Sequence, residues 1–328
     1  MNKDFDKEMR NKLINVLEKK ILISKLDNSL QENDLTKPVN CNGFGRIRHY
    51  RMYEHKDWVF DPLPNLPASE ALNKKTEEIT LAQVFQLAGC NWNCWYCFVD
   101  NELRSGTMEK SKFFSPSELI SAYLQEKNKP QVIVLSGGQP DLVPEWIVWA
   151  MEALESNKLD KTTYLWSDDN LSTDYYFKYL TSEQRDKIAS YDSYGKVGCF
   201  KGFDESSFTF NTQTLGKKYH KQFEIFNKLR LEGLDIYGYV TFTSPNNHSL
   251  RNKMDKFVMK LSEIHDKMPL RVVPLKIVAY SPVAKRITTE YKRSLENQHE
   301  ALKVWNQILE EKYTHNERKI EIHKVKIN

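Results

Sequence analysis

Residues 89–98 read Gly89-Cys90-Asn91-Trp92-Asn93-Cys94-Trp95-Tyr96-Cys97-Phe98, and this stretch carries the strongest structural signal in the chain. Its C-x3-C-x2-C spacing places three thiolates on one short loop. Structural zinc sites and ferredoxin-type clusters use four protein ligands. Three close ligands without a fourth nearby therefore predict an iron–sulfur cluster in which one iron stays open to another molecule.

Two other interpretations of the cysteines remain open. A zinc knuckle would need a fourth ligand, and the nearest histidine in sequence, His55, lies before a proline-rich segment. A C-x-x-C redox pair would use Cys94 and Cys97 but would leave Cys90 without a role. The iron–sulfur interpretation accounts for all three cysteines, and we expect a metal centre made by Cys90, Cys94 and Cys97.

Strands and helices alternate from about residue 79 onward. Six apolar segments are predicted to be strands, at 80–87, 131–135, 162–167, 196–201, 234–242 and 270–279. Helical patterns follow them, beginning with a capping box at Ser115-x-x-Glu118 that has proline at the first helical position. Six β/α units predict a parallel sheet covered by helices, and six are fewer than the eight of a closed barrel. The predicted fold is α/β, an open partial (β/α)6 barrel.

The composition divides the chain into three segments. Residues 1–77 form an N-terminal extension with a helical pattern, a basic segment and an extended linker at 61–67 that holds three prolines. The pattern of that first helix uses Phe5, Met9, Leu13, Val16 and Leu17. Residues 78–285 form the α/β core, and residues 286–328 form a C-terminal helix and tail.

Charge and cysteine content restrict the class of protein. The 48 basic and 44 acidic residues leave a net charge of +4, less than nucleic-acid binders usually concentrate. The basic run at 46–51 could contact a phosphate, but such a run is more often a solvated face. Five cysteines, three of them within eight residues, oppose a disulfide framework and indicate a cytoplasmic protein. No signal peptide is recognisable at residues 1–20, and we expect no membrane contact.

With the cysteine loop following the first strand of a partial barrel, residues 78–282 resemble the radical S-adenosylmethionine (SAM) superfamily. The resemblance implies that Cys90, Cys94 and Cys97 hold a [4Fe–4S] cluster and that SAM chelates the fourth iron. It also implies reductive cleavage of SAM to a 5′-deoxyadenosyl radical, which abstracts hydrogen from a substrate. The core is then expected to be a partial barrel of the radical SAM type.

Other positions match the family's motifs less closely. Tyr96 occupies the aromatic position that lies against adenine in the family. The run Gly137-Gly138-Gln139-Pro140 resembles the family's Gly-Gly-Glu-Pro, which binds the methionyl amine. Gln139 replaces the glutamate and supplies no charge, and a plain turn after the second strand is the alternative.

Three further residues end the third and fourth strands. Asp168 could bind ribose hydroxyls or a cation, or could cap a turn with Asp169. Lys201 resembles the lysine that meets the SAM carboxylate in glycyl-radical-activating members, although Cys199 and Phe200 replace the aspartate and leucine before it. Lys201 could equally be a surface residue. Cys199 shares a face with Lys201 and could donate hydrogen to a substrate radical, or it could be a buried core thiol.

The substrate stays open at this stage. The resemblance implies a flavodoxin or ferredoxin as electron donor and an oxidoreductase or activase with a single cluster. The partial lysine match favours a glycyl radical enzyme, hence a protein substrate. The basic extension leaves a nucleotide or nucleic-acid substrate as an alternative, and a non-catalytic iron–sulfur or zinc module is a third.

Overall fold

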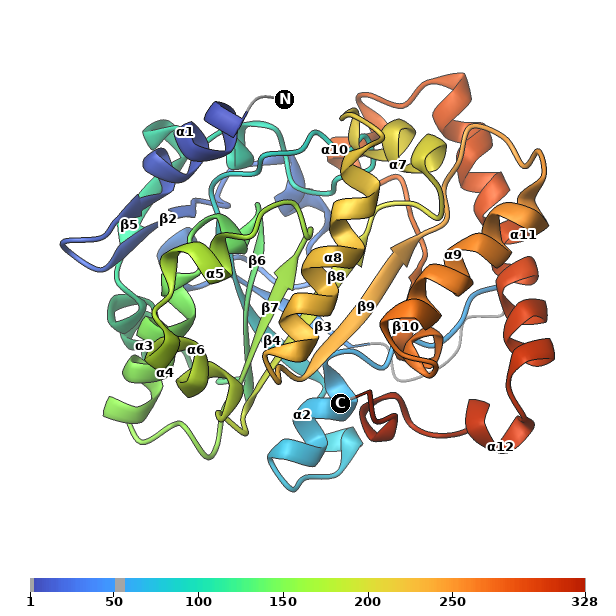
Figure 1. Cartoon of the computed structure of the whole chain (residues 1–328). Helices are drawn as coiled ribbons and strands as arrows, with labels where there is room; N and C mark the ends of the chain where they lie inside the picture. The colour runs from blue at the N-terminus through green and yellow to red at the C-terminus, as the bar shows by residue number, and fades with distance from the viewer. Residues whose placement is uncertain (1–2, 51–56, 328) are drawn as a thin grey trace.

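The protein, described by a computed structural model over residues 3–50 and 57–327, is built on one large sheet (Figure 1). Arg51 and His55 lie outside the described residues. Six strands run parallel and in chain order, and they are β4 (Leu81–Leu87), β6 (Val132–Gly137), β7 (Tyr164–Asp169), β8 (Tyr194–Phe200), β9 (Ile236–Thr241) and β10 (Val272–Leu275). Within the described residues no strand pairing closes the ring. The predicted α/β fold with an open, mostly parallel sheet is confirmed.

Helices cover the outer face of this sheet (Figure 1). The six predicted helices are α3 (Pro116–Gln125), α4 (Glu145–Ser156), α6 (Ser182–Ala189), α8 (Lys218–Leu231), α9 (Leu250–Ile264) and α11 (Thr289–Lys312). The capping box expected at Ser115 and Glu118 begins α3, and a second one begins α6. Shorter helices that the pattern did not predict are α5 (Tyr175–Tyr179), α7 (Glu205–Thr212), α10 (Ser281–Ala284) and α12 (His315–Arg318).

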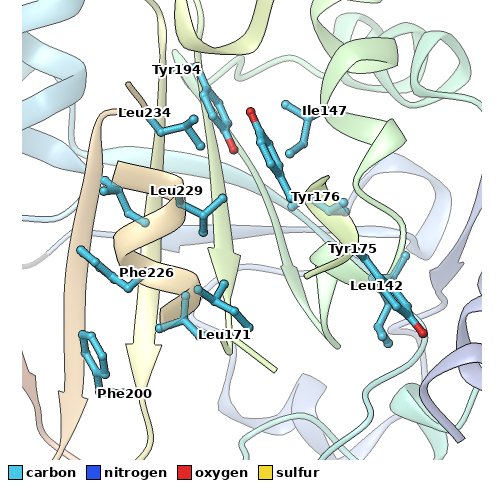
Figure 2. Close-up of a cluster of buried hydrophobic side chains, with 14 of the residues drawn as sticks. Leu142, Ile147, Leu171, Tyr175, Tyr176, Tyr194, Phe200, Phe226, Leu229 and Leu234 are labelled. Atoms are coloured by element: carbon cyan, nitrogen blue, oxygen red, sulfur yellow. The ribbon is translucent and has the colours of Figure 1, made fainter. Parts of the chain in front are cut away.

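Apolar side chains form one core on each face of the sheet. On the outer face, Phe226 and Leu229 of α8 pack towards Phe200 and Leu171 at the strands (Figure 2). On the inner face, a second cluster includes Val84, Val134, Trp166, Cys199 and Tyr239. This alternation along each strand separates residues that hold the helices from residues that line the concave side. We call the concave side the inner face.

The N-terminal extension joins the same sheet. Strand β3 (Gly45–His49) pairs antiparallel with β4, and β2 (Lys20–Ser24) pairs antiparallel with β4 and with β5 (Ser111–Phe114). Arg46 and Arg48 of β3 lie opposite Val84 and Ala82 and therefore face inward. The expectation that the basic run forms a solvated face is wrong for Arg46, which is 9% exposed.

The predicted N-terminal helix is too long. Helix α1 (Lys3–Leu13) ends at Leu13, and the chain turns into the short strand β1 (Ile14–Asn15) that pairs with β2. Val16 and Leu17 lie at the hairpin tip and are 54% and 98% exposed. Tertiary pairing of the hairpin therefore outweighs the apolar spacing that suggested another helical turn.

The expected linker at 61–67 is partly helical. Helix α2 (Asn65–Ala71) begins inside it, because Pro67 lies in the first turn, where a backbone N–H has no helical partner. The chain before α2 crosses towards the far edge of the sheet: Trp58 Nε1 donates to the carbonyl of Pro274 in β10 at 2.9 Å. Residues 57–64 thus lie between β3 and β10. The boundaries between the three predicted segments, near residues 77 and 285, stay predictions.

Among the described helices, none is both long enough and apolar enough to cross a lipid bilayer.

Candidate functional site

The cysteine loop leaves the carboxyl end of β4, where ligands collect in parallel α/β folds. Cys90, Cys94 and Cys97 all carry free thiols, and Cys94 is the most buried of the three. Arg104 braces the loop: its guanidinium donates to the Trp92 carbonyl at 2.9 Å, and its own carbonyl accepts from the Cys90 N–H at 3.1 Å. The loop is therefore fixed by contacts that do not use the thiols.

The thiols of Cys90 and Cys94 are protonated at neutral pH in the absence of a metal. Burial raises the pKa of Cys94 to about 12, and the neighbouring Lys201 opposes that shift. Burial also raises the pKa of Cys90, against the influence of Arg104 and Lys201. Metal binding would therefore release protons from this loop.

Between residues 3 and 50 and between 57 and 327, no three His, Cys, Asp or Glu side chains converge as the ligands of a single metal ion would. In a four-iron cluster each cysteine binds a different iron, so the thiolates surround the cluster and need not meet at one point. Three free thiols on one braced loop are the donor set that such a cluster uses, and the residues present fit it.

The two glycines after β6 bring backbone against the cysteine loop. A Cβ at Gly138 would overlap the carbonyl oxygen of Gly89, and Gly137 has a φ of +90° that favours glycine. The N–H of Gly138 donates to the Leu87 carbonyl at 3.0 Å, and that of Gln139 donates to the Gly89 carbonyl at 2.7 Å. The glycines thus allow close approach, and the partner in this structure is the protein's own backbone just before Cys90.

The Gln139 side chain is engaged within the protein. Its Nε2 donates to Asp169 Oδ1 at 2.6 Å, and its Oε1 accepts from the Asn170 N–H at 2.8 Å. Gln139 is 1% exposed. The amide therefore joins the ends of β6 and β7, a role that sequence reasoning missed.

Asn170 carries this network to the cysteine loop. Its Nδ2 donates to Asn91 Oδ1 at 3.1 Å and lies 3.9 Å from the Cys90 sulfur. Its Oδ1 accepts from the Ser172 N–H at 3.0 Å, which fixes the orientation of the amide. A neutral N–H donor therefore points at one of the three sulfurs.

Lys201, Tyr96 and Cys199 gather on the other side of the loop. The Tyr96 hydroxyl lies 3.0 Å from Thr241 Oγ1 at the end of β9. The pKa of Lys201 is raised: burial lowers it, and the ionised forms of its thiol and phenol neighbours, Cys199 and Tyr96 foremost, raise it by more. Lys201 is half-buried and has Cys94 and Cys97 as neighbours, so it is not a fully exposed lysine.

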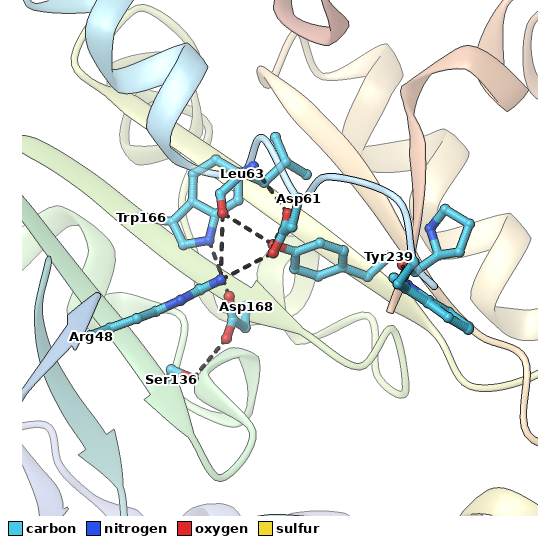
Figure 3. Close-up of polar contacts among 9 residues, drawn as sticks. Arg48, Asp61, Leu63, Ser136, Trp166, Asp168 and Tyr239 are labelled. Carbon is cyan, nitrogen blue, oxygen red and sulfur yellow. Dashed lines mark hydrogen bonds and ion pairs between the residues drawn. The ribbon is translucent and has the colours of Figure 1, made fainter. Parts of the chain in front are cut away.

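The two adjacent aspartates have different surroundings. Asp168 faces inward and accepts from Ser136 Oγ at 2.7 Å and from Trp166 Nε1 at 3.1 Å (Figure 3). Asp169 caps the turn, because its Oδ1 accepts from the Leu171 N–H at 2.7 Å. Asp168 is therefore the carboxylate that faces the inner side of the sheet, and Asp169 is the one that caps the turn after β7.

Cys199 is a buried thiol on the inner face of β8. It is 8% exposed, and burial raises its pKa to about 11. The inner-face cluster packs it with Tyr239 and Trp166. A thiol that stays protonated here would be able to give up a hydrogen atom, and it also fills the core.

Sequence reasoning missed a fully buried lysine. Lys196 of β8 is 0% exposed and contacts Asp141 Oδ1 at 2.6 Å, Ser167 Oγ at 3.4 Å and Asp169 Oδ2 at 4.0 Å. A lysine inside a continuous apolar strand is a signal for a buried carboxylate partner, since a buried charge must be paired. The pattern did not indicate which carboxylate it would be.

It also missed a polar group on the inner face that involves the extension. Arg48 pairs with Asp61 at 3.3 Å, and the Tyr239 hydroxyl lies 3.0 Å from each oxygen of Asp61 (Figure 3). Arg48 also donates to the Leu63 carbonyl at 3.4 Å. These contacts hold the segment around residue 61 against β3 and β9.

Comparison with known proteins gives distant structural similarity alone. No protein-family model matches the chain, and no curated protein matches it. It is similar to the crystal structure of Streptococcus suis SuiB bound to S-adenosylmethionine, with 13% identity and a TM-score of 0.43 over 68% of this chain and 46% of that one. For the SuiB structure without a stated ligand, the identity is 13% and the TM-score 0.38, over 60% of this chain and 41% of that one. For SuiB bound to precursor peptide SuiA, the identity is 14% and the TM-score 0.44, over 78% of this chain and 55% of that one. The chain thus spans about half the length of those proteins. This similarity is too distant to carry an argument about activity.

Proposed function

We propose that the protein is a radical SAM enzyme. The observation that supports this most directly is the set of three free thiols, Cys90, Cys94 and Cys97, on a braced loop at the carboxyl edge of six parallel strands. Lys201 has the same thiols as neighbours.

In this proposal the three cysteines hold a [4Fe–4S] cluster, and SAM lies over the inner face. When bound, the cluster would supply the electron that cleaves SAM to a 5′-deoxyadenosyl radical. Lys201 offers a positive charge for the SAM carboxylate. Tyr96 offers an aromatic surface for adenine, held in place by the contact between its hydroxyl and Thr241.

The remaining predicted positions have more specific tasks. The run from Gly137 to Pro140 would offer backbone carbonyls to the methionyl amine, because the Gln139 side chain is already occupied by Asp169 and Asn170. Asp168 would accept from ribose hydroxyls, since it faces inward. Cys199 would be the group that donates hydrogen to a substrate radical.

A flavodoxin or ferredoxin would deliver the electron. A protein substrate such as a glycyl radical enzyme, and a nucleotide or nucleic acid, are the two substrate classes that the sequence resemblance left open. Both are compatible with a site at the carboxyl edge of the sheet.

The test is anaerobic reconstitution with iron and sulfide, reduction, and measurement of bound iron and of 5′-deoxyadenosine formed from SAM. We expect wild-type protein to hold about four irons and to form 5′-deoxyadenosine. Replacing Cys90, Cys94 or Cys97 by alanine should remove both, whereas Cys41→Ala, a buried cysteine at another place, should retain them. Full iron content in all three site variants, or tetrahedral zinc in anaerobically purified protein, would refute the proposal.

A further inference from the structure

Strand β3 and the residue after it present three polar side chains to the inner face. Arg46 and Arg48 alternate on one side of the strand, and Tyr50 follows in the same alternation. The guanidinium of Arg48 lies 5.4 Å from the centre of the Tyr50 ring. Because β3 lies next to β4, these side chains line the sheet at the strand that leads into the cysteine loop.

Arg48 is neutralised by the protein itself. Asp61 supplies a carboxylate at 3.3 Å, and the Leu63 carbonyl accepts a second bond at 3.4 Å (Figure 3). This arginine therefore serves to hold the N-terminal segment.

Arg46 is different because most of its donors are unused. It is 9% exposed, and its Nε donates to Gln86 Oε1 at 3.1 Å. Gln86 is the hydrogen-bond acceptor that the described residues supply to this guanidinium, and its terminal nitrogens are not among the buried polar atoms that lack a partner. The nearby carboxylate of Asp168 already accepts from Ser136 and Trp166.

A planar guanidinium matches the two oxygens of a carboxylate or phosphate. Burial and the neighbouring Arg48 lower the pKa of Arg46 to about 10, so it is still protonated at neutral pH. The arginine therefore offers a fork of charged donors on the inner face.

Tyr50 gives a second, independent sign of a polar ligand site. Its ring is buried, and its hydroxyl is a buried polar atom that has no hydrogen-bond partner in the part of the chain that the structure describes. Such atoms are rare in folded proteins and call for an explanation. A ligand oxygen on this face would satisfy the hydroxyl.

We infer that Arg46, assisted by Tyr50, binds an anionic oxygen group, a carboxylate or a phosphate, of the molecule on which this protein acts. The position supports this, because the Arg46 guanidinium lies 5.4 Å from the centre of the Phe98 ring, and Phe98 follows Cys97 directly. The inference rests on the proposed function only where it calls this ligand the substrate.

The SAM carboxylate is not the expected ligand of Arg46. We assign Lys201, which follows β8, to that carboxylate. Arg46 lies on β3, which pairs with β4, and two strands, β6 and β7, lie between β4 and β8. The two cationic side chains therefore lie at different parts of the inner face. A substrate with an acidic group would lie between the extension and the cysteine loop.

Anion binding can be tested on purified protein without iron. Saturation-transfer NMR would measure acetate, phosphorus-31 line broadening would measure inorganic phosphate, and neutral acetamide would serve as the uncharged control. We expect acetate or phosphate to bind, acetamide to bind much more weakly, and Arg46→Gln to weaken anion binding at least about tenfold. Preference between the two anions identifies the substrate group as a carboxylate or a phosphate.

The matched control is Arg293→Gln, an exposed arginine of α11, which should bind the anion as wild type does. Arg46→Gln removes a buried charge and should have a urea midpoint at or above that of wild type in anion-free buffer. If it fails to fold, Arg46→Lys, which keeps the charge but loses the fork, should still bind phosphate more weakly than wild type.

Equal anion affinity in wild type and the Arg46 variants, or no anion binding by wild type, would overturn the inference. Loss of 5′-deoxyadenosine formation from SAM alone in Arg46→Gln, measured without substrate after reconstitution, would also overturn it, because Arg46 would then belong to the SAM site. Absence of SAM cleavage in wild type would refute the proposed function and leave the anion result standing.

Discussion

Gln139 and Asp169 join the carboxyl ends of β6 and β7 through a hydrogen bond of 2.6 Å between two side chains that are almost fully buried. The same amide accepts from the Asn170 N–H. A glutamine can donate at one atom and accept at the other, whereas an ionised glutamate can only accept. The need for both a donor and an acceptor explains why residue 139 is a glutamine, where the family motif Gly-Gly-Glu-Pro has a glutamate.

We therefore expect Gln139→Glu to destabilise the protein by about 1–3 kcal/mol, because the new carboxylate would face Asp169 without a donor between them. Urea unfolding at pH 7 measures this free energy. Gln307→Glu, an exposed position of α11, should change it by less than about 0.5 kcal/mol. A Gln139→Glu variant as stable as wild type would show that the bond to Asp169 is not important.

The fold was predictable where local signals agreed. The β/α alternation, the caps of α3 and α6 and the glycine-ended strand β6 are all set by residues near one another in sequence. The pairing of β2 and β3 with β4 was not predictable, because these strands meet their partner across many residues. The same holds for the end of α1, which the β1–β2 hairpin decides.

The site divides in the same way. The three cysteines of the candidate metal centre can be recognised from their spacing alone, because Cys90, Cys94 and Cys97 lie within eight residues. Arg46, Asp61 and Tyr239 come from distant parts of the chain, and only the folded sheet brings them to one face. Arg46 looked like part of an exposed basic run, because periodicity shows which residues share a face of a strand but not which face is covered.

The buried group around Lys196 predicts a pH-dependent stability. Lys196 and Asp169 face Asp141 directly, and Tyr194 and Tyr176 are its titratable neighbours. Burial and the Asp169 carboxylate raise the pKa of Asp141 to about 8, against the opposing effect of Lys196. The folded protein therefore holds a proton that the unfolded chain, with an ordinary pKa of about 4, releases at lower pH.

The stability that this proton contributes is complete below about pH 4 and is lost as the pH rises to about 8. Urea unfolding of wild type between pH 5 and pH 8 should show this loss, with a slope of at most about 1.4 kcal/mol per pH unit for one proton. Asp141→Asn, which cannot titrate, should have a flatter profile in the same range. If the free energy of unfolding changes with pH in the same way in both proteins, Asp141 does not hold a proton in the folded state.

Asn170 is expected to act on the metal centre without binding it. Its Nδ2 lies 3.9 Å from the Cys90 sulfur, and hydrogen bonds to ligand sulfurs raise the reduction potential of iron–sulfur clusters by stabilising the added electron. We expect Asn170→Leu to bind iron but to have a more negative midpoint potential, measured by electron paramagnetic resonance in a redox titration. Asn306→Leu, at an exposed site of α11, should leave the potential unchanged. An unchanged potential in Asn170→Leu would mean that the amide only shapes the loop.

Two tyrosines on the inner face offer a matched pair of hydroxyl deletions. The Tyr239 hydroxyl donates to the Asp61 carboxylate at 3.0 Å, and a hydrogen bond to a charged group contributes about 1.5–3 kcal/mol. Tyr239→Phe should therefore lower the free energy of unfolding by about that amount and loosen the segment around residue 61, which hydrogen exchange would detect.

The Tyr50 hydroxyl has no partner among the described residues, so Tyr50→Phe should lower the free energy of unfolding by less than about 0.5 kcal/mol without ligand. If both deletions cost the same, the hydrogen bond from Tyr239 to Asp61 is not what holds the segment around residue 61. If Tyr50→Phe is neutral for stability but weakens phosphate or acetate binding, the two hydroxyls have separate tasks: one holds the extension, and the other serves the ligand of Arg46.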